Sequence, residues 1–149
     1  AETRRDCIAI IGSFPEELKA ALLTAQADRP YREGGWTGRQ VVHHIADSHM
    51  NAFVRFRLAL TEDQPTIKPY REAEWAKLAD SITEDPAVSV QILEGLHRRW
   101  HRMLTAMSEA DFARAAIHPD HGAVTLDWFL QLYAWHGRHH LGHLKLTGE

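Results

Sequence analysis

Four histidines lie close together near the C-terminal end of the sequence, at positions 136, 139, 140 and 143. Two pairs among them, His136 with His140 and His139 with His143, are separated by four residues. If this segment is helical, the spacing places both imidazoles of a pair on one face, one turn apart. Two neutral imidazoles so placed can bind one divalent metal ion. The spacing therefore predicts part of a metal site.

A second histidine cluster lies far upstream and contains His43, His44 and His49. At 100° per residue, apolar and small side chains form one stripe along the surrounding segment, at positions 41, 45, 48, 52, 56 and 59. His44 falls at the flank of this stripe, whereas His43 falls opposite it, toward solvent. His44 is therefore the preferred inward ligand, and His49, at the other flank, remains an alternative. The two clusters together predict a three-histidine metal site inside a helical bundle.

A single histidine needs no functional explanation, because it is most simply an ordinary surface or core residue. A pair facing inward among aromatic side chains is different, because burying unpaired imidazoles would cost a few kcal/mol and a metal would remove that cost. Periodicity does not choose between the two pairs, since both continue an apolar face of the last helix. The face of His136 and His140 holds Phe129 and Tyr133, and the other face holds Trp128, Leu132 and Trp135. The sequence has no His-Glu-x-x-His pattern, so a zincin-like protease is not indicated.

The elements that must position these histidines are helices, because helical periodicity dominates the sequence. We expect four long helices, at about residues 3–25, 37–60, 86–107 and 125–146. Thr37 and Gln40 fit a capping box at the start of the second helix. Pro15 lies inside the first, where we expect a kink or two abutting helices. These lengths predict an all-α four-helix bundle that forms a single domain over residues 1–149.

The connections between these helices are predicted from their prolines and glycines. Residues 61–69 contain Pro65 and Pro69 and should form a long crossing loop, followed by a short helix at about 71–79. Ser108 should cap a further short helical segment. Residues 118–124, with Pro119 and Gly122, should form an irregular turn. The long connection after the second helix predicts at least one crossover in the bundle.

Composition excludes several classes of function. The formal net charge is -3 and no basic stripe is present, which argues against nucleic-acid binding. No apolar run approaches the roughly 20 residues needed to span a bilayer, so we expect no membrane association. The first residues do not resemble a signal peptide. Cys7 is the only cysteine, so no intramolecular disulfide is possible, which is typical of a cytoplasmic protein.

Two segments resemble motifs of a known family. Residues 34–51 resemble the start of the second helix in the YfiT-like branch of the DinB superfamily, and residues 132–140 resemble the final-helix motif of that branch. The order of features between them also matches, namely Arg55-Phe56, residues 58–62, residues 68–70 and His118-Pro119. The resemblance extends from about residue 13 onward. We expect the chain to begin later than full-length relatives.

This resemblance implies a fold and a ligand set. The family fold is a four-helix bundle in up-down-down-up order, here with short extra helices in the connections. The family's metal ligands match His44, His136 and His140, and the metal is zinc or nickel, one divalent ion per chain. Relatives include metal-dependent hydrolases and S-transferases that use a low-molecular-weight thiol such as bacillithiol or mycothiol. The resemblance also implies a homodimer.

Three functions are compatible with these features. The first is an S-transferase, in which the three-histidine metal activates a small bacillithiol-like thiol that attacks an electrophilic substrate. The alternative is a hydrolase using metal-bound water, for which Asp47, one turn from His44, is the nearest candidate base or could instead orient a ligand. The second alternative is a non-enzymatic, metal-dependent stress or binding protein. Arg55, Arg57 or Arg138 could pair with carboxylates of the thiol.

Overall fold

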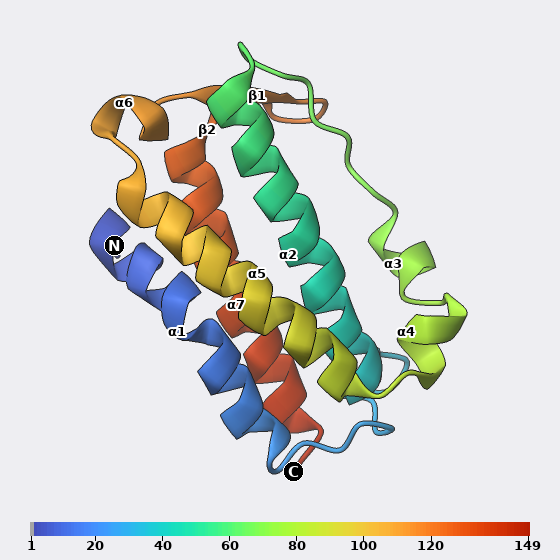
Figure 1. Ribbon diagram of the computed structural model, residues 1–149. Coiled ribbons are helices and arrows are strands. Elements are labelled where there is room, and N and C mark those ends of the chain that lie inside the picture. The colour runs from blue at the N-terminus through green and yellow to red at the C-terminus, as the bar shows by residue number, and fades with distance from the viewer. Residues whose placement is uncertain (1) are drawn as a thin grey trace.

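Four long helices make up most of the computed structural model, which describes residues 2–149 (Figure 1). They are α1 (Arg4–Leu22), α2 (Gly38–Thr61), α5 (Pro86–Ala106) and α7 (Leu126–Leu146). Helix α1 packs against α5 and α7, and α2 packs against the same two helices. Helices α1 and α7 run in one direction along the bundle, and α2 and α5 run in the opposite direction (Figure 1). The predicted up-down-down-up bundle is therefore confirmed.

The crossover between α2 and α5 carries two short helices, α3 (Glu72–Trp75) and α4 (Ala79–Thr83). The sequence predicted one helix over residues 71–79, and the structure instead divides the helical residues between two single-turn elements. The connection between α5 and α7 begins with α6 (Glu109–Phe112), whose capping box joins Ser108 and Asp111. The short segment predicted after Ser108 is confirmed.

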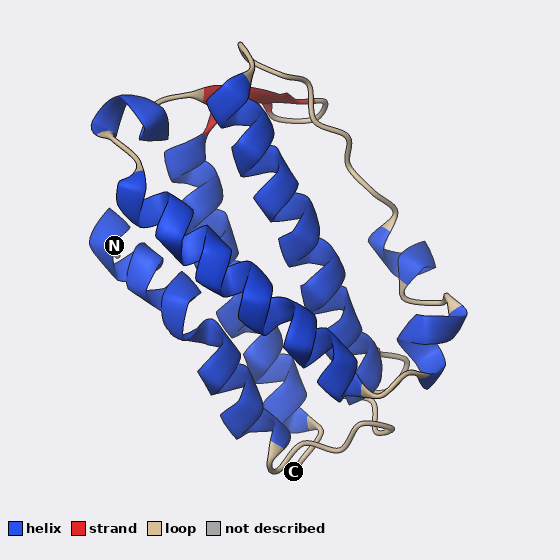
Figure 2. Cartoon of the chain, viewed as in Figure 1, coloured by secondary structure: helices blue, strands red, loops and turns tan. Residues whose placement is uncertain are grey.

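A β-hairpin follows α6, where the sequence predicted an irregular turn. Strands β1 (Ala115–His118) and β2 (Gly122–Thr125) pair in antiparallel register, with His118 opposite Gly122 (Figure 2). Gly122 has a φ of 70°, which a glycine adopts without steric cost. The three residues between the strands, with Gly122 after them, fit a three-residue hairpin loop. The amide of Ile67 donates to the carbonyl of Ile117, so the crossover loop is tied to this hairpin.

The sequence predicted a kink or two abutting helices at Pro15. The structure shows one continuous helix with Pro15 buried inside it, so the second alternative is wrong. Proline has no amide hydrogen, so it cannot donate to the carbonyl four residues earlier, which belongs to Ile11. Packing of α1 against α5 and α7 offsets this loss. The helix begins after a capping box formed by Thr3 and Asp6 and ends at Leu22, three residues before the predicted end.

The buried side chains form two hydrophobic clusters along the bundle. One includes Trp100 and Tyr133, and the other includes Phe14 and Ile45. His49 lies between the clusters, because its ring is 5.3 Å from Phe14 and 5.8 Å from Trp100 (centroid distances). A layer of buried histidines therefore interrupts an otherwise apolar core.

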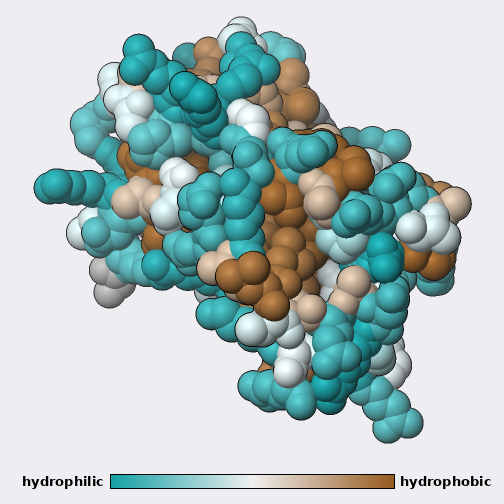
Figure 3. All heavy atoms as spheres, turned by 60° about the horizontal axis from the view of Figure 1, so that its bottom comes forward, coloured by the Kyte–Doolittle hydropathy of each residue, from teal (hydrophilic) through white to brown (hydrophobic). Residues whose placement is uncertain are grey.

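The surface seen from the bottom of the bundle is mostly hydrophilic, with hydrophobic atoms gathered in a limited central area (Figure 3). Among the described residues, no helix is both long and apolar enough to cross a bilayer.

Candidate metal centre

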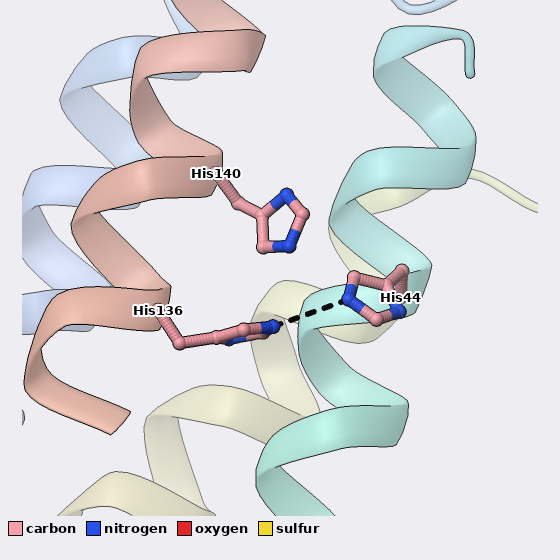
Figure 4. A group of neighbouring side chains, drawn as sticks. All are labelled: His44, His136 and His140. Atoms are coloured by element: carbon pink, nitrogen blue, oxygen red, sulfur yellow. Dashed lines mark hydrogen bonds between the residues drawn. The ribbon is translucent and has the colours of Figure 1, made fainter. Parts of the chain in front are cut away.

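Three histidines from two helices face one another inside the bundle. His44 belongs to α2, and His136 and His140 belong to α7 (Figure 4). Each offers one ring nitrogen, and these three atoms all lie within 4.8 Å of one another. The Nε2 atoms of His44 and His136 are 3.2 Å apart. The structure thus brings together the three residues predicted as metal ligands, and their role as ligands stays a prediction.

Burial of one face of α7 decides between the two histidine pairs. Phe129 and Tyr133, on the face of His136 and His140, are buried in the core. Trp128 and Trp135, on the face of His139 and His143, are 40% and 56% exposed. Both faces are apolar in sequence, so periodicity left the choice open. The pair that the family resemblance implied, His136 and His140, lies on the face of α7 that is buried in the core.

His44 is positioned by the start of α2. The Thr37 hydroxyl accepts from the amide of Gln40, whose side chain accepts in return from the amide of Thr37. This predicted capping box fixes where the helix begins and hence which side of it each later residue occupies. Trp36 packs against His44, with 4.8 Å between ring centroids. The tryptophan thus covers the imidazole on the side of the loop that precedes α2.

Burial keeps all three imidazoles neutral. It lowers the pKa of His44 to about 4. Burial lowers the pKa of His136 to about 3, and the neighbouring His44 and His139 add to this effect. The pKa of His140 is also lowered, to about 2, first by burial and then by His136 and His44. At neutral pH each ring therefore keeps a lone pair, which is the form that binds a metal.

The separation between the nitrogens of His44 and His136 suits a divalent transition-metal ion. Zinc binds histidine nitrogen at about 2.0–2.1 Å in tetrahedral geometry, so two ligand nitrogens lie about 3.3 Å apart. The separation of 3.2 Å between His44 and His136 is close to that value. Among the described residues, no carboxylate or thiolate joins the group. Three imidazoles leave at least one coordination position for another molecule, as in catalytic rather than structural sites.

The other histidines of the two clusters occupy different environments. His43 is buried, 6% exposed, with Nδ1 2.6 Å from Ser89 Oγ and Nε2 2.9 Å from the carbonyl oxygen of Glu84. The prediction that it faces solvent is wrong, because α4 and α5 cover that side of α2. His139 is exposed, and His143 stacks on Tyr31, with Nδ1 3.3 Å from that of His140.

His49 is fully buried but does not belong to the three-histidine group. Its Nε2 lies 3.2 Å from Nδ1 of His136, and its Nδ1 lies 2.7 Å from Nε2 of His97. His97, on α5, is not among the candidate ligands predicted from the sequence. Its spacing does not connect it to the two histidine clusters, because its place beside His49 depends on how α5 packs.

The Asp47 carboxylate does not interact directly with the three histidines among the described residues. No hydrogen bond or ion pair joins its carboxylate to His44 among the described residues. Burial, and to a smaller extent Asp80, raises its pKa to about 6, and His43 opposes the shift. Such a pKa suits a general base at neutral pH. The structure leaves its predicted role, as base or as orienting group, a prediction.

A cleft of about 330 Å³ opens beside His136. Its wall contains the aromatic and apolar side chains of Trp128, Phe129, Leu132 and Tyr133. Arg55 also lines the cleft and donates from Nη1 to the hydroxyl of Tyr133, at 2.9 Å. A larger groove of about 850 Å³ between α1 and α5 contains none of the three histidines. The smaller cleft therefore reaches the candidate metal centre at His136, and a separate pocket of about 270 Å³, lined in part by Tyr31 and Trp36, reaches it at His140.

Comparisons with known proteins agree with this arrangement. The family model described as the DinB superfamily matches residues 16–144. A curated Bacillus subtilis protein, YfiT, named as a candidate metal-dependent hydrolase, is 46% identical over 96% of this chain and 83% of its own length. A similarly named protein of Bacillus mycoides is 49% identical over 93% of this chain and 82% of its own length.

Two solved structures share the fold. That of YfiT from Bacillus subtilis has a TM-score of 0.92 at 44% identity, covering 97% of this chain and 85% of that protein. It is described as having an unusual four-helix bundle topology. A mycothiol-dependent maleylpyruvate isomerase has a TM-score of 0.74 at 16% identity, covering 96% of this chain and 61% of that protein. The second likeness concerns the fold alone.

Proposed function

We propose that this chain, which belongs to the DinB superfamily, is a metal-dependent enzyme that binds its substrates in the cleft beside His136. The observation that carries the proposal is the group of His44, His136 and His140, with neutral nitrogens within 4.8 Å of one another. These three residues would hold one zinc or nickel ion per chain. Both metals accept imidazole ligands, and their relative availability decides between them.

The reaction we favour is transfer of a small thiol to an electrophile. A bound divalent ion would lower the pKa of a thiol or a water molecule that entered an open position. The chain's own residues would bind and orient the reactants. The apolar wall of Trp128, Phe129 and Leu132 suits the body of an electrophile, and it excludes water from one side of the cleft.

Arg55 supplies the polar contact of the cleft. Its guanidinium donates to the Tyr133 hydroxyl and, at 3.2 Å, to the carbonyl oxygen of Lys68, which fixes its plane. It forms no ion pair with a carboxylate among the described residues. A thiol of the bacillithiol class carries carboxylates, and a guanidinium held in place can pair with one of them in a two-pronged geometry.

Hydrolysis is the second candidate, because the curated relatives are named as metal-dependent hydrolases. Hydrolysis requires a base to take a proton from water. Asp47 has a suitable pKa, about 6, but none of its contacts among the described residues reaches the three histidines. Thiol transfer does not need this base, which is why we rank it first.

The first experiment measures metal content by mass spectrometry in protein purified without a nickel column. We expect about one zinc or nickel ion per wild-type chain. His44→Ala and His140→Ala should lose it, because two imidazoles bind more weakly than three. His139→Ala is the matched control, since His139 is exposed on the same helix and outside the group. Wild-type protein that folds but takes up no added metal would contradict the proposal.

Activity assays then separate the two reactions. Metal-loaded protein is tested for conjugation of glutathione, bacillithiol and mycothiol to a reactive electrophile, and in parallel for hydrolysis of esters, amides and lactones. Thiol conjugation that is lost in His140→Ala supports the transferase. Hydrolysis that is lost in both His140→Ala and Asp47→Asn would instead support the hydrolase, with Asp47 as its base.

A further inference from the structure

Two fully buried histidines extend from His136 and form a row with it behind the candidate metal centre. His136 Nδ1 lies 3.2 Å from His49 Nε2, and His49 Nδ1 lies 2.7 Å from His97 Nε2. His97 Nδ1 in turn lies 2.6 Å from the carbonyl oxygen of Ile11. We call His136, His49 and His97 the histidine row. It begins at α7, continues through α2 and α5, and ends on the backbone of α1. Three of the long helices therefore contribute one histidine each, and α1 contributes the carbonyl group at the end of the row.

The end of the row at a carbonyl group sets the direction of every hydrogen bond in it. A carbonyl oxygen only accepts, so the Nδ1 of His97 must carry its hydrogen. In a neutral imidazole the other nitrogen is then an acceptor. His97 Nε2 therefore accepts from His49 Nδ1, and His49 Nε2 accepts from His136 Nδ1. The remaining nitrogen of His136, Nε2, is left with a lone pair.

This argument requires neutral rings, and the surroundings of the row favour them. His49 and His97 are both 0% exposed, and no carboxylate contacts either ring among the described residues. An imidazolium buried without a counter-charge would be strongly unfavourable. Phe14 packs against both rings, with centroid distances of 5.3 Å to His49 and 5.1 Å to His97. The apolar ring thus holds their planes without offering a competing hydrogen-bond partner.

Pro15 explains why the carbonyl oxygen of Ile11 is free to accept a hydrogen bond from His97. In a regular helix this oxygen would accept from the amide of residue 15. Proline lacks that hydrogen, so the oxygen inside a packed helix needs another donor. His97 provides it, at 2.6 Å. A proline in α1 is therefore connected, through two buried histidines, to a nitrogen of His136 in the candidate metal centre.

We propose that His49 and His97 are positioning residues that hold His136 as the Nδ1–H tautomer, with the lone pair of Nε2 directed at the metal position. The position of that nitrogen, 3.2 Å from Nε2 of His44, agrees with this assignment. Neither residue touches the ion itself. A hydrogen bond on the far nitrogen fixes the orientation of a ligating imidazole and raises its basicity. The proposal rests on the proposed metal site, but the tautomer can be tested without metal.

The first test reads the tautomers directly in metal-free wild-type protein. Two-bond proton–nitrogen correlation NMR on protein labelled with ¹⁵N-histidine distinguishes protonated from unprotonated ring nitrogens. We expect His97, His49 and His136 all to carry the hydrogen on Nδ1. In Pro15→Ala the Ile11 carbonyl regains a helical donor, so the share of this tautomer at His97 should fall. An Nε2–H tautomer at His136 in wild-type protein would overturn the proposal.

The second test measures zinc affinity by competition with a chromophoric chelator. His49→Phe keeps a ring of similar size but removes both hydrogen bonds, and we expect affinity to fall about 10- to 100-fold. His49→Gln can still accept from His136, so part of the affinity should return. His43→Phe is the matched control, because His43 is a buried histidine of the same helix that contacts Ser89 and Glu84 instead.

The outcomes separate this proposal from the proposed function. Equal affinity in wild type, His49→Phe and His43→Phe would overturn the positioning role while leaving the metal site intact. Equal losses in His49→Phe and His43→Phe, with no return in His49→Gln, would assign the effect to general destabilisation and also overturn it. If wild-type protein binds neither zinc nor nickel, the proposed function fails, and the tautomer of His136 alone decides whether the row orients it.

Discussion

Buried imidazoles without counter-charges make the protein sensitive to acid. Burial is the leading cause of the lowered pKa of His44, His97, His136 and His140, and His49 is shifted in the same direction. Unfolded histidines bind a proton below a pH of about 6.5. Between that pH and the lower folded values, only the unfolded chain takes up these protons. Stability therefore falls as the pH falls through this window.

We predict that metal-free protein loses several kcal/mol of unfolding free energy between about pH 6.5 and 4.5. A single histidine whose pKa falls from 6.5 to about 4 accounts for up to about 3 kcal/mol of this loss. The raised pKa of Asp47, about 6, has the opposite effect, because it increases stability as the pH falls. This one carboxyl group is outweighed by at least four histidines. Urea unfolding at a series of pH values measures the slope. A stability that is flat across this range would contradict the burial of the histidines.

Gly137 marks a close approach of α7 to α1. A Cβ atom at this position would lie 2.7 Å from Cε2 of Phe14, a buried ring that also packs on His49 and His97. We predict that Gly137→Ala destabilises the protein by about 1–3 kcal/mol, because the core must shift to admit the methyl group. Chemical denaturation measures the change.

Gly142→Ala serves as the control for that substitution. Gly142 lies on the same helix, and a Cβ atom there would meet nothing within 4 Å. Alanine has the higher helix propensity, so a gain of about 0.5–1 kcal/mol is expected. If the two substitutions had equal effects, the close contact at Gly137 would not be the cause.

Individual residues show how far the sequence predicts the site. His44 was preferred over His43 from its angle on the helical wheel, and the structure places His44 in the group. The same wheel misplaced His43, because a single helix viewed alone does not show which neighbours cover its second side. The sequence did not indicate the role of His97, since its hydrogen-bond partners, His49 and Ile11, belong to two other helices.

At the scale of elements, helix starts were more predictable than connections. Capping residues act locally, so Thr37 with Gln40 and Ser108 with Asp111 could be recognised in the sequence. The hairpin of β1 and β2 could not, because its short strands depend on the crossover loop that pairs with Ile117. Pro15 predicted a kink or a break in α1, and the structure shows a helix without a break.

The cap of α2 offers a test at this scale. We predict that Thr37→Ala lowers the unfolding free energy by about 1 kcal/mol, since the amide of Gln40 loses its acceptor. Thr37→Ser keeps the hydroxyl and should remain within a few tenths of wild type. Thermal unfolding of both variants gives the comparison. A Thr37→Ala protein as stable as Thr37→Ser would mean that the capping box contributes nothing.

For the whole molecule, we predict a homodimer. The outer face of α7 exposes Trp128 and Trp135, with the partly buried Leu132 between them, and such a face is costly in water. Light scattering coupled to size exclusion should give twice the chain mass of 17.0 kDa. Trp135→Glu should shift this mass toward the monomer, whereas Leu23→Glu, at an isolated exposed position, should not. A wild-type mass of 17.0 kDa would refute the dimer.

The order of the helices also has a consequence for biosynthesis. The main packing partners of α1 and α2 are α5 and α7 rather than each other, so α1 and α2 lack these partners until α5 and α7 have been synthesised. Their apolar faces therefore remain exposed, or bound by a chaperone, until the later helices emerge. The last of these, α7, brings His136 and His140. A nascent chain that still lacks α7 cannot complete the three-histidine group, so a metal ion held by that group, as proposed, would have to bind after translation of that helix.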